Sequence, residues 1–326
     1  MPKVSVIIPI YGVEKYIERC ARSLFEQTLD DIEYIFINDC TKDYSIEILQ
    51  SIMEEYPHRK KQIQIKDMPY NSGLAAVRKY GISLAKGEYI IHCDSDDWVE
   101  KEMYETMYKK AIENNADTVC CGVFIEYDSH TTIANYNEKY NEHQLMYDVI
   151  APINMLYFAM WNRLVSKKIY QRYNIIPFTN INMWEDVGTI TRIRFHSSCN
   201  IIINKALYHY NRTNILSITH NKQLKNSLEK IKCVQLLEEF FKIQKCEHQY
   251  RYFIALLKYK SKEELKRKNT WLWINTFPEA KRYLWFIRHH FNKTETIKLF
   301  ILSYGAKIIK YFFKNNIVSV QKWRID

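Results

Sequence analysis

The chain has 326 residues, of which 47% are apolar and 14% aromatic, so it can bury a large core and is not intrinsically disordered. Its net charge of +10 is unevenly placed. Residues 221–326 hold 23 Lys and Arg against 9 Asp and Glu, whereas residues 1–220 are mildly acidic. A basic C-terminal region suits nucleic acid, an anionic membrane surface or an acidic polymer, and composition does not choose among them.

The N-terminus and the cysteines favour a cytoplasmic protein. The first residues run directly into a strand-like pattern, without the charged, apolar and small-residue regions of a secretory signal. The eight cysteines show no CxxC spacing and no histidine at zinc-finger distance. We expect them to be reduced and mostly packed, including the adjacent pair Cys120 and Cys121.

The N-terminal third alternates between strand and helix patterns. The β-branched run 3–10 predicts a strand buried on both faces, and apolar residues at helical spacing predict a helix over 17–25. Further strands are predicted at 32–38, 63–67 and 88–93, with a helix around 48–56 and another from Gly73 to Ala85. This alternation predicts an α/β fold with a parallel sheet covered by helices on both sides.

The pattern changes near residue 220. Strand signals fade there and amphipathic helices take over, so residues 221–326 are predicted to form a basic α-helical C-terminal region. No apolar run reaches the ~18–20 residues that a membrane-spanning helix needs. The sequence therefore does not predict an integral membrane protein.

Polar side chains follow the predicted strands where each strand ends. In open α/β sheets the ligand crevice lies beyond the carboxyl ends of the strands. The candidate residues there are Tyr11 and Glu14, Asp39, Asn71 and Gly73, and Asp94-Ser95-Asp96-Asp97. We expect them to converge on one edge of the sheet.

The run HCDSDDW at 92–98 is the strongest of these signals. Its three aspartates repel one another unless a cation or a set of donors compensates them. Mg²⁺ or Mn²⁺ bridging to a diphosphate supplies that compensation, because these ions take one or two carboxylates and fill the other positions with phosphate oxygens and water. The alternative is an acidic turn that caps a helix starting near Glu100.

Weaker patterns accompany this run. Asp39 can accept from a nucleobase or a ribose, or it can stabilise a helix N-terminus. Arg78 can hold a diphosphate bidentately or form a surface ion pair. Glu185 and Asp186 lie in an apolar, aromatic segment, where burial raises a carboxyl pKa toward that of a general base, although such pairs are also common on surfaces. Phosphate-compatible donors also gather in the loop-like stretch 208–219, namely His209, Arg212, Ser217 and Thr219.

Five segments, in this order, resemble a known family. They are VSVIIPIYGVEKYIERCARSLFEQT, INDCTKD, NSGLAAVRKYGISLAKGEYIIHCDSDDW, the Trp-Glu-Asp segment and Tyr-x-Arg-x₄-Ser-Ile-Thr. Together they are similar to family 2 glycosyltransferases of GT-A fold, bacterial enzymes that assemble capsular polysaccharide, exopolysaccharide or cell-wall glycans. The resemblance covers roughly residues 3–220. It implies a Rossmann-like GT-A domain over 1–220, with a nucleotide-binding part over about 1–100 and an acceptor-side part over about 100–220.

The resemblance implies roles for the matching residues. Asp39 matches the carboxylate that binds the uracil ring, and Arg78 an arginine near the diphosphate. Asp186 matches the catalytic base, supported by Glu185. Asp94 and Asp96 match the metal and ribose motif, with Asp96 as the direct metal ligand. The other expected site residues are Pro9, Tyr11, Glu14 and Ser95 around the nucleotide, Arg212 and Ser217 in a segment that closes over the pyrophosphate, and His209 or His220 in the metal shell.

Two positions depart from the family pattern. The usual Asp-Asp-Gly-Ser turn is Asn38-Asp39-Cys40-Thr41 here, which keeps the second carboxylate and replaces the glycine. Arg78-Lys79 stands where the family often has Arg-Asn.

The implied reaction is inverting, metal-dependent transfer of a sugar from a UDP-linked donor to a hydroxyl of a glycan or lipid-linked acceptor. The metal and Arg212 would take up charge on the leaving diphosphate while Asp186 removes the acceptor proton. A nucleotidyltransferase would show a Gly-rich, basic phosphate loop after the first strand, and YGVEKY has one glycine and no such loop. A non-catalytic glycan- or membrane-binding module is disfavoured because all the matching aspartates are present.

The segment 296–314 predicts an attachment to the inner face of the cell membrane. One helical face carries Ile297, Ile301, Tyr304, Ile308 and Phe312, beside a basic stripe of Lys307, Lys310 and Lys314. Such a helix suits an anionic membrane surface, where each basic residue contributes about 1 kcal/mol. Alternatively, the face packs on the catalytic domain or on a second subunit. Nucleic acid is not an expected partner, because no recognised binding motif accompanies the charge.

Overall fold

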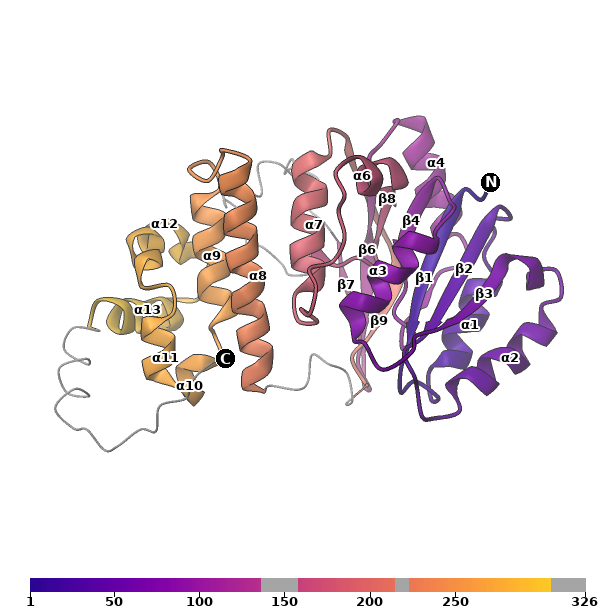
Figure 1. Ribbon diagram of the computed structural model, residues 1–326, viewed down its shortest axis with the longest axis horizontal. Coiled ribbons are helices and arrows are strands. Elements are labelled where there is room, and N and C mark those ends of the chain that lie inside the picture. The colour runs from indigo at the N-terminus through magenta and orange to yellow at the C-terminus, as the bar shows by residue number, and fades with distance from the viewer. Residues whose placement is uncertain (136–157, 215–222, 306–326) are drawn as a thin grey trace.

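One mixed β-sheet organises the N-terminal two thirds of the protein (Figure 1). The computed structural model describes residues 1–135, 158–214 and 223–305. The strands are β1 Val4–Ile10, β2 Ile32–Asn38, β3 Ile63–Asp67, β4 Tyr89–His92, β5 Trp98–Val99, β6 Thr118–Glu126, β7 Thr131–Ala134, β8 Arg163–Ser166 and β9 Asn200–Asn211. They lie in the order β3-β2-β1-β4-β8-β6-β9-β5, and β7 pairs with β6.

The half of the sheet formed by β1 to β4 is parallel, as predicted. α1 (Ile17–Phe25) and α2 (Ser45–Glu55) pack on the face that carries Val6, whereas α3 (Leu74–Leu84) packs on the face that carries Ile7. Successive strand side chains point to opposite faces, so both faces of β1 are buried. The predicted strands and helices of this part are therefore confirmed to within a few residues.

The other half of the sheet is mostly antiparallel. β8 is antiparallel to β4 and to β6, β5 is antiparallel to β9, and only the pair of β6 with β9 is parallel. β6 and β7 are joined by a short turn at 127–130, and a connection of this length allows only antiparallel pairing. The parallel pairing predicted for the strands up to residue 93 is confirmed, and the later strands, for which no pairing was predicted, make the sheet mixed.

The predicted loop-like stretch at 208–219 begins inside a strand. Tyr208 to Asn211 belong to β9, which pairs with β6 on one side and with β5 on the other. Pairing on both sides satisfies the backbone of these residues, which a single-sequence pattern does not reveal. Ser217, Thr219 and His220 lie outside the described residues.

The C-terminal region is helical, as predicted, and its helices are α8 (Leu224–Ile243), α9 (Arg251–Ser261), α10 (Leu265–Lys268), α11 (Thr270–Asn275), α12 (Leu284–Ile287) and α13 (Lys293–Tyr304). In Figure 1 they form a separate orange-to-yellow layer beside α7 (Glu185–His196), while α4 (Met103–Glu113) and α6 (Lys167–Arg172) stay with the sheet. Among the helices of the described ranges, none has the length and apolar character needed to cross a membrane.

One hydrophobic cluster joins the sheet to these helices. It contains Ile7 of β1, Ile190 of α7, Leu237 of α8 and Leu299 of α13, all of them buried. The predicted division at residue 220 stays a prediction, but α8 packs directly on α7.

All eight cysteines are free thiols, and five of them, including Cys120 and Cys121, are buried.

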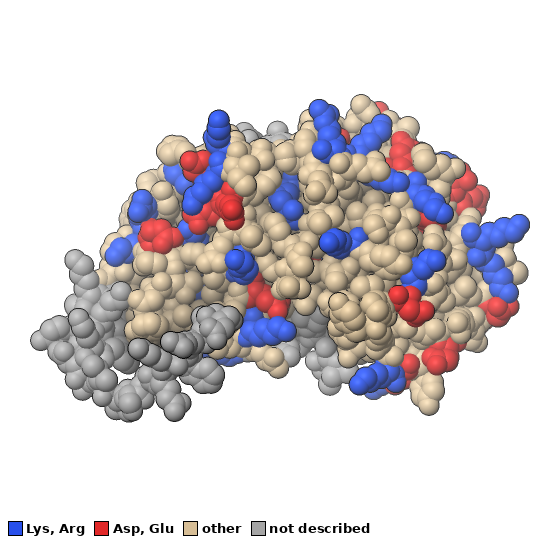
Figure 2. All heavy atoms as spheres, in the orientation of Figure 1, with Lys and Arg blue, Asp and Glu red and all other residues tan. Residues whose placement is uncertain are grey.

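On the face shown in Figure 2, basic side chains are interspersed with acidic ones and do not form one continuous patch.

Candidate functional site

The loops that follow β1 and β2 are tied together by hydrogen bonds. The backbone N–H of Gly12 donates to Thr41 Oγ1 over 2.9 Å, and the carboxylate of Glu14 accepts from the backbone N–H of Tyr44 over 3.2 Å. Tyr11 stays exposed at the carboxyl edge of the sheet, whereas Pro9 lies within β1. Glu14 thus stabilises the rim of the crevice, and Tyr11 is free to face a ligand.

Asp39 ends β2 and holds the start of α3. Its side chain is buried, and its two oxygens accept from the backbone N–H groups of Ser72 and Gly73 over 2.7 and 2.9 Å. A carboxylate has about four lone-pair sites, so this arrangement leaves part of its acceptor capacity unused. The next residue, Cys40, has φ 57, the left-handed conformation for which glycine is favoured. The turn thus keeps the geometry that the missing glycine would supply.

Gly73 marks a close approach between two loops of the site. Its φ is 82, and a Cβ placed there would lie 2.6 Å from the amide of Asn182. Asn182 in turn accepts from the backbone N–H of Ala75 in the first turn of α3. This contact fixes the Asp39 side of the crevice against the loop that leads to Glu185.

Arg78 of α3 lies between two carboxylates of the site. It is only 2% exposed. Its Nη2 donates to Asp94 Oδ1 over 2.7 Å, and its Nη1 donates to Glu185. Both terminal nitrogens of this guanidinium are thus engaged, one by the buried Glu185 and the other by the partly exposed Asp94. Arg78 therefore joins two carboxylates of the site, and its predicted place near the diphosphate stays a prediction.

The aspartate run after β4 is anchored by β9. Asp97 is buried and accepts from the hydroxyl of Tyr208 over 2.6 Å and from the backbone N–H of Asn211 over 2.7 Å. Burial, together with the charges of Asp96 and Asp94, raises the pKa of Asp97 well above its usual range. Asp97 thus fixes the turn that carries Asp94 and Asp96 by binding two donors of β9.

Asp94 and Asp96 are the members of the run that lie toward the crevice. Asp94 is partly exposed beside Arg78, while Asp96 accepts from the side-chain amide of Asn214 over 2.8 Å. Burial, and next the charge of Asp94, raise the pKa of Asp96 to about 6. Ser95 between them is buried.

The donor set fits a hard divalent cation. Asp94 and Asp96 offer carboxylate oxygens, the ligand type that Mg²⁺ and Mn²⁺ prefer, and their mutual repulsion is relieved by a cation. Within residues 1–135, 158–214 and 223–305, no cluster of three His, Cys, Asp or Glu forms a complete metal shell. The assignment of Asp94 and Asp96 to a divalent ion therefore stays a prediction.

His209 does not complete this shell. Its Nδ1 and Nε2 are hydrogen bonded to Glu126 and Glu100 over 2.7 and 2.8 Å, and its ring is stacked between Trp98 and Phe124. Both ring nitrogens are thus already engaged, which corrects the prediction of His209 as a metal ligand.

Glu185 and Asp186 form the first turn of α7. Glu185 is buried against Arg78, whereas Asp186 is partly exposed and accepts from the backbone N–H of Val187 over 2.7 Å. Burial raises the pKa of Glu185 above its usual value and that of Asp186 to about 6, and the charge of Arg78 opposes both shifts. The pair thus has the electrostatic character of a general base and its support.

α8 holds this pair in place. The carboxylate of Glu229 accepts from the backbone N–H groups of Asn182 and Met183, each over 2.9 Å. Cys233 donates to the carbonyl of Trp184, the residue that precedes α7 with φ 68. The C-terminal helices therefore buttress the loop that carries Asp186.

Arg212 and Arg19 lie near the site and differ in what they contact. Arg212, just beyond β9, is exposed, and its guanidinium lies 5.7 Å from the centre of the Tyr210 ring. Arg19 of α1, which the sequence did not single out, stacks on Trp98 at 3.4 Å and lowers the pKa of Asp96 by its charge. Arg19 was missed because it lies on the polar face of an ordinary amphipathic helix.

The sheet, its carboxyl-edge carboxylates and the helical buttress define an α/β protein of GT-A type, and comparison with known proteins agrees. The family model "Glycosyl transferase family 2" matches residues 5–173, more than half of the chain. The chain therefore belongs to glycosyltransferase family 2.

A protein of similar sequence is also named as a glycosyltransferase. The glycosyltransferase GlyA of Streptococcus pneumoniae serotype 4 is 31% identical over 219 residues, which cover 64% of this chain and 30% of that protein. The chain thus spans less than a third of the length of this relative.

Solved structures share the fold. The structure of S. aureus TarS 1-349 in complex with UDP-GlcNAc matches with a TM-score of 0.66 and 16% identity, over 94% of this chain and 92% of that one. The mannosyltransferase PcManGT from Pyrobaculum calidifontis, in complex with GDP-Man and Mn²⁺, matches with a TM-score of 0.53 and 14% identity, over 97% and 88% of the two chains. At these identities the likeness concerns the fold alone, and it confirms the predicted GT-A fold.

Proposed function

We propose that the protein is an inverting glycosyltransferase that moves a sugar from a UDP-linked donor to a hydroxyl of a glycan or lipid-linked acceptor in polysaccharide synthesis. The observation that carries this proposal is the chain of contacts from Asp94 through Arg78 to Glu185. It brings the acidic run after β4 next to the Glu185-Asp186 pair. A phosphate-side site and a candidate base thus lie on either side of one buried cation.

Donor binding is assigned to the carboxyl edge of β1, β2 and β4. The unused acceptor capacity of Asp39 suits an N–H of uracil, and the exposed Tyr11 lies at the same edge. Arg212, exposed beyond β9, suits the pyrophosphate; Ser217 is assigned to the same group from its motif. The bound UDP-GlcNAc named for TarS supports a nucleotide-sugar ligand in this fold.

Asp94 and Asp96 are assigned to a Mn²⁺ or Mg²⁺ ion. Such an ion supplies neutralisation of the negative charge that develops on a leaving diphosphate. The Mn²⁺ named for PcManGT supports this assignment. Arg78 holds Asp94 in place through the 2.7 Å contact and thereby fixes one of the two ligands.

Asp186 is assigned the role of base. Its partly exposed carboxylate accepts the proton of the acceptor hydroxyl, which then attacks the sugar from the face opposite the leaving group. Inversion follows, so an α-linked donor gives a β-linked product. Glu185 keeps Arg78 close to this reaction and balances its charge.

The proposed location is the cytoplasm, with peripheral attachment to the inner face of the cell membrane. Ile297, Ile301 and Tyr304 of α13 are each more than half exposed, although Tyr304 stacks on Phe300 and donates to the carbonyl of Lys281. The basic stripe at Lys307, Lys310 and Lys314 lies outside the described residues.

A donor screen tests the proposed function. The purified protein is incubated with UDP- and GDP-linked sugars and with Mn²⁺ or Mg²⁺, and released nucleoside diphosphate is measured. Release from a UDP-linked hexose or N-acetylhexosamine is the expected result. Release of pyrophosphate from a nucleoside triphosphate would instead identify a nucleotidyltransferase, and binding of a glycan without any release would identify a non-catalytic module.

A further inference from the structure

The three residues before α7, Asn182, Met183 and Trp184, form a turn that we call the Trp184 turn. Trp184 has φ 68 and ψ 24, the left-handed conformation that bulky residues rarely adopt. Such a conformation persists only where the surrounding structure holds it. Because Glu185 and Asp186 follow directly in α7, the position of the proposed base depends on what holds this turn.

The nucleotide side of the site holds one end of the Trp184 turn. The side-chain oxygen of Asn182 accepts from the backbone N–H of Ala75 over 3.1 Å, and a Cβ on Gly73 would lie 2.6 Å from the same amide. Gly73 in turn donates its backbone N–H to Asp39 over 2.9 Å. Asn182 thus contacts the loop that Asp39 fixes.

Helix α8 supplies a second set of contacts to the turn. The Glu229 side chain is only 12% exposed, and one of its oxygens, Oε2, accepts from the backbone N–H groups of both Asn182 and Met183 over 2.9 Å. Cys233 donates to the carbonyl of Trp184 over 3.2 Å. Residues four apart share one face of a helix, so this face of α8 binds three backbone groups of the turn.

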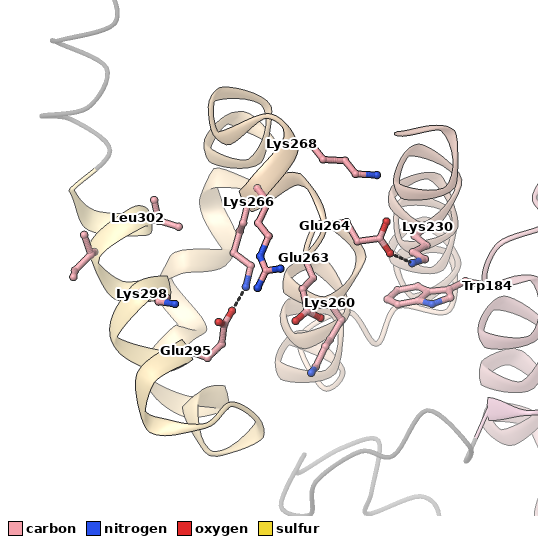
Figure 3. Close-up of a pocket in the computed structure, with 12 residues that line it drawn as sticks. Trp184, Lys230, Lys260, Glu263, Glu264, Lys266, Lys268, Glu295, Lys298 and Leu302 are labelled. Atoms are coloured by element: carbon pink, nitrogen blue, oxygen red, sulfur yellow. Dashed lines mark hydrogen bonds and ion pairs between the residues drawn. The ribbon is translucent and has the colours of Figure 1, made fainter. Parts of the chain in front are cut away.

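The side chain of Trp184 also lies against the C-terminal helices. It lines a pocket of about 860 Å³ among them, the C-terminal pocket, together with Lys230 of α8 and Glu264. Figure 3 shows the indole of Trp184 beside these two residues, which form an ion pair of 2.9 Å. Both the backbone and the ring of Trp184 are therefore held by the C-terminal region.

We propose that Glu229 is a positioning residue for sugar transfer, which holds the Trp184 turn so that Asp186 points at the acceptor hydroxyl. This inference rests on the proposed function, and it makes a residue of the C-terminal helical region part of the catalytic machinery. A reacting group that moves by about 1 Å can lose ~100-fold in rate. The contact of Asn182 with Ala75 does not depend on Glu229, so nucleotide binding should survive the loss of Glu229.

Hydrogen exchange tests the contact without any substrate. Backbone amide exchange is measured by mass spectrometry on the full chain, in peptides that contain Asn182 and Met183. We expect these amides to exchange about 10-fold faster or more in Glu229→Ala, because their bonds to a charged acceptor are lost. Exchange at the wild-type rate overturns the proposal.

Kinetics test the consequence for the reaction. With the donor identified by the screen, Glu229→Ala should lower kcat for nucleotide release ~100-fold, while calorimetry with UDP and Mn²⁺ should give a Kd within about 3-fold of wild type. An unchanged kcat, or a loss that lies entirely in UDP binding, overturns the positioning role.

Two conservative variants separate position from charge, and they serve also if Glu229→Ala does not fold. Both hydrogen bonds end on one oxygen, so Glu229→Gln can keep them and should retain kcat within about 3-fold. Glu229→Asp keeps the charge, but its carboxylate is one methylene shorter, so kcat should fall ~10-fold or more. Higher activity in Glu229→Asp than in Glu229→Gln would show that the charge acts and would overturn the proposal.

The matched control is Glu238→Ala in the same helix. Glu238 pairs with Lys258 of α9 over 2.9 Å, so this variant removes a carboxylate that joins α8 to a different neighbour. We expect it to leave kcat and the exchange of Asn182 and Met183 unchanged. An equal loss of kcat in Glu238→Ala would assign the effect to general weakening of the helices and overturn the proposal. Absence of nucleotide release from every donor in the wild type overturns the proposed function instead, and hydrogen exchange then decides whether Glu229 holds the turn.

Discussion

The two charged regions of this protein are built in opposite ways. Around Arg78, two carboxylates surround one buried cation, and each of its terminal nitrogens has a partner. Around the C-terminal pocket, exposed cations such as Lys268 and Lys298 have no ion-pair partner within the described residues. The first arrangement is complete within the chain and fixes the geometry of groups that do chemistry. The second leaves exposed cations in water, where a single charge adds little to stability.

We expect the largest effect from a substitution of Asp96, because its negative charge is only partly compensated within the described residues. Burial and the charge of Asp94 raise the pKa of Asp96 against the opposing effects of Asn214 and Arg19, so we expect Asp96→Ala to abolish sugar transfer and chelation to have the same effect. Nucleotide release in the presence and absence of EDTA checks this. Undiminished transfer in excess EDTA would contradict the metal assignment and would leave Arg212 to carry the leaving-group charge.

Stability measurements sharpen the contrast between the buried and the exposed cations. Arg78→Met leaves Asp94 and Glu185 as unpaired carboxylates, and breaking a buried pair in this way costs about 3–5 kcal/mol of unfolding free energy. Lys268→Met removes an exposed side chain and should change stability by about 0.5 kcal/mol or less. Urea unfolding of the two variants compares them. Equal stability of both would show that Arg78 is not a structural cation.

Asp186→Asn tests the base that Glu185 and Arg78 position. The amide keeps the shape of the side chain and cannot accept the acceptor proton, so transfer should fall by at least ~100-fold while donor binding is retained. Donor binding and transfer are measured separately on the folded variant. Near-normal turnover would remove Asp186 from the role of base.

The pH profile provides a finer test of the same site. Burial raises the pKa of Asp186 to about 6, and the base works only when it is deprotonated. Activity should therefore be retained above this pH and fall about tenfold for each pH unit below it. Initial rates between pH 4.5 and 8 check the slope, with unfolding monitored in parallel. The residual activity of Asp186→Asn should lack this dependence, and an unchanged profile would contradict the assignment.

Much of the parallel half could be predicted from the sequence, because its strands are continuous apolar runs and its helices keep a helical period. The partners of Arg78 could not be predicted, because Asp94 and Glu185 lie far apart in sequence and meet only through the sheet. His209 illustrates the same limit. Its residue type suggests a metal ligand, but Glu100 and Glu126, brought together by β5 and β6, engage both ring nitrogens.

The smallest expected effect concerns α13 and a membrane surface. Ile297 and Ile301 are exposed, and the sequence places lysines farther along the same segment, so the helix suits an anionic bilayer and should bind it reversibly. We expect the full chain to float with anionic vesicles, less at high salt, and hardly at all with neutral ones. Ile297→Ser with Ile301→Ser should reduce the bound fraction ~10-fold, because two apolar side chains then lose their burial in the bilayer.

The matched control for this helix is Ile112→Ser with Ile133→Ser, which removes two exposed isoleucines elsewhere on the surface. Equal loss in the control would show that the effect is one of general surface hydrophobicity. If the wild-type chain binds neither kind of vesicle, the exposed face of α13 serves another contact, and sedimentation of the same variants would then show whether a second copy of the chain covers it. A membrane role requires that vesicle binding depends on α13 while the mass of the protein in solution does not.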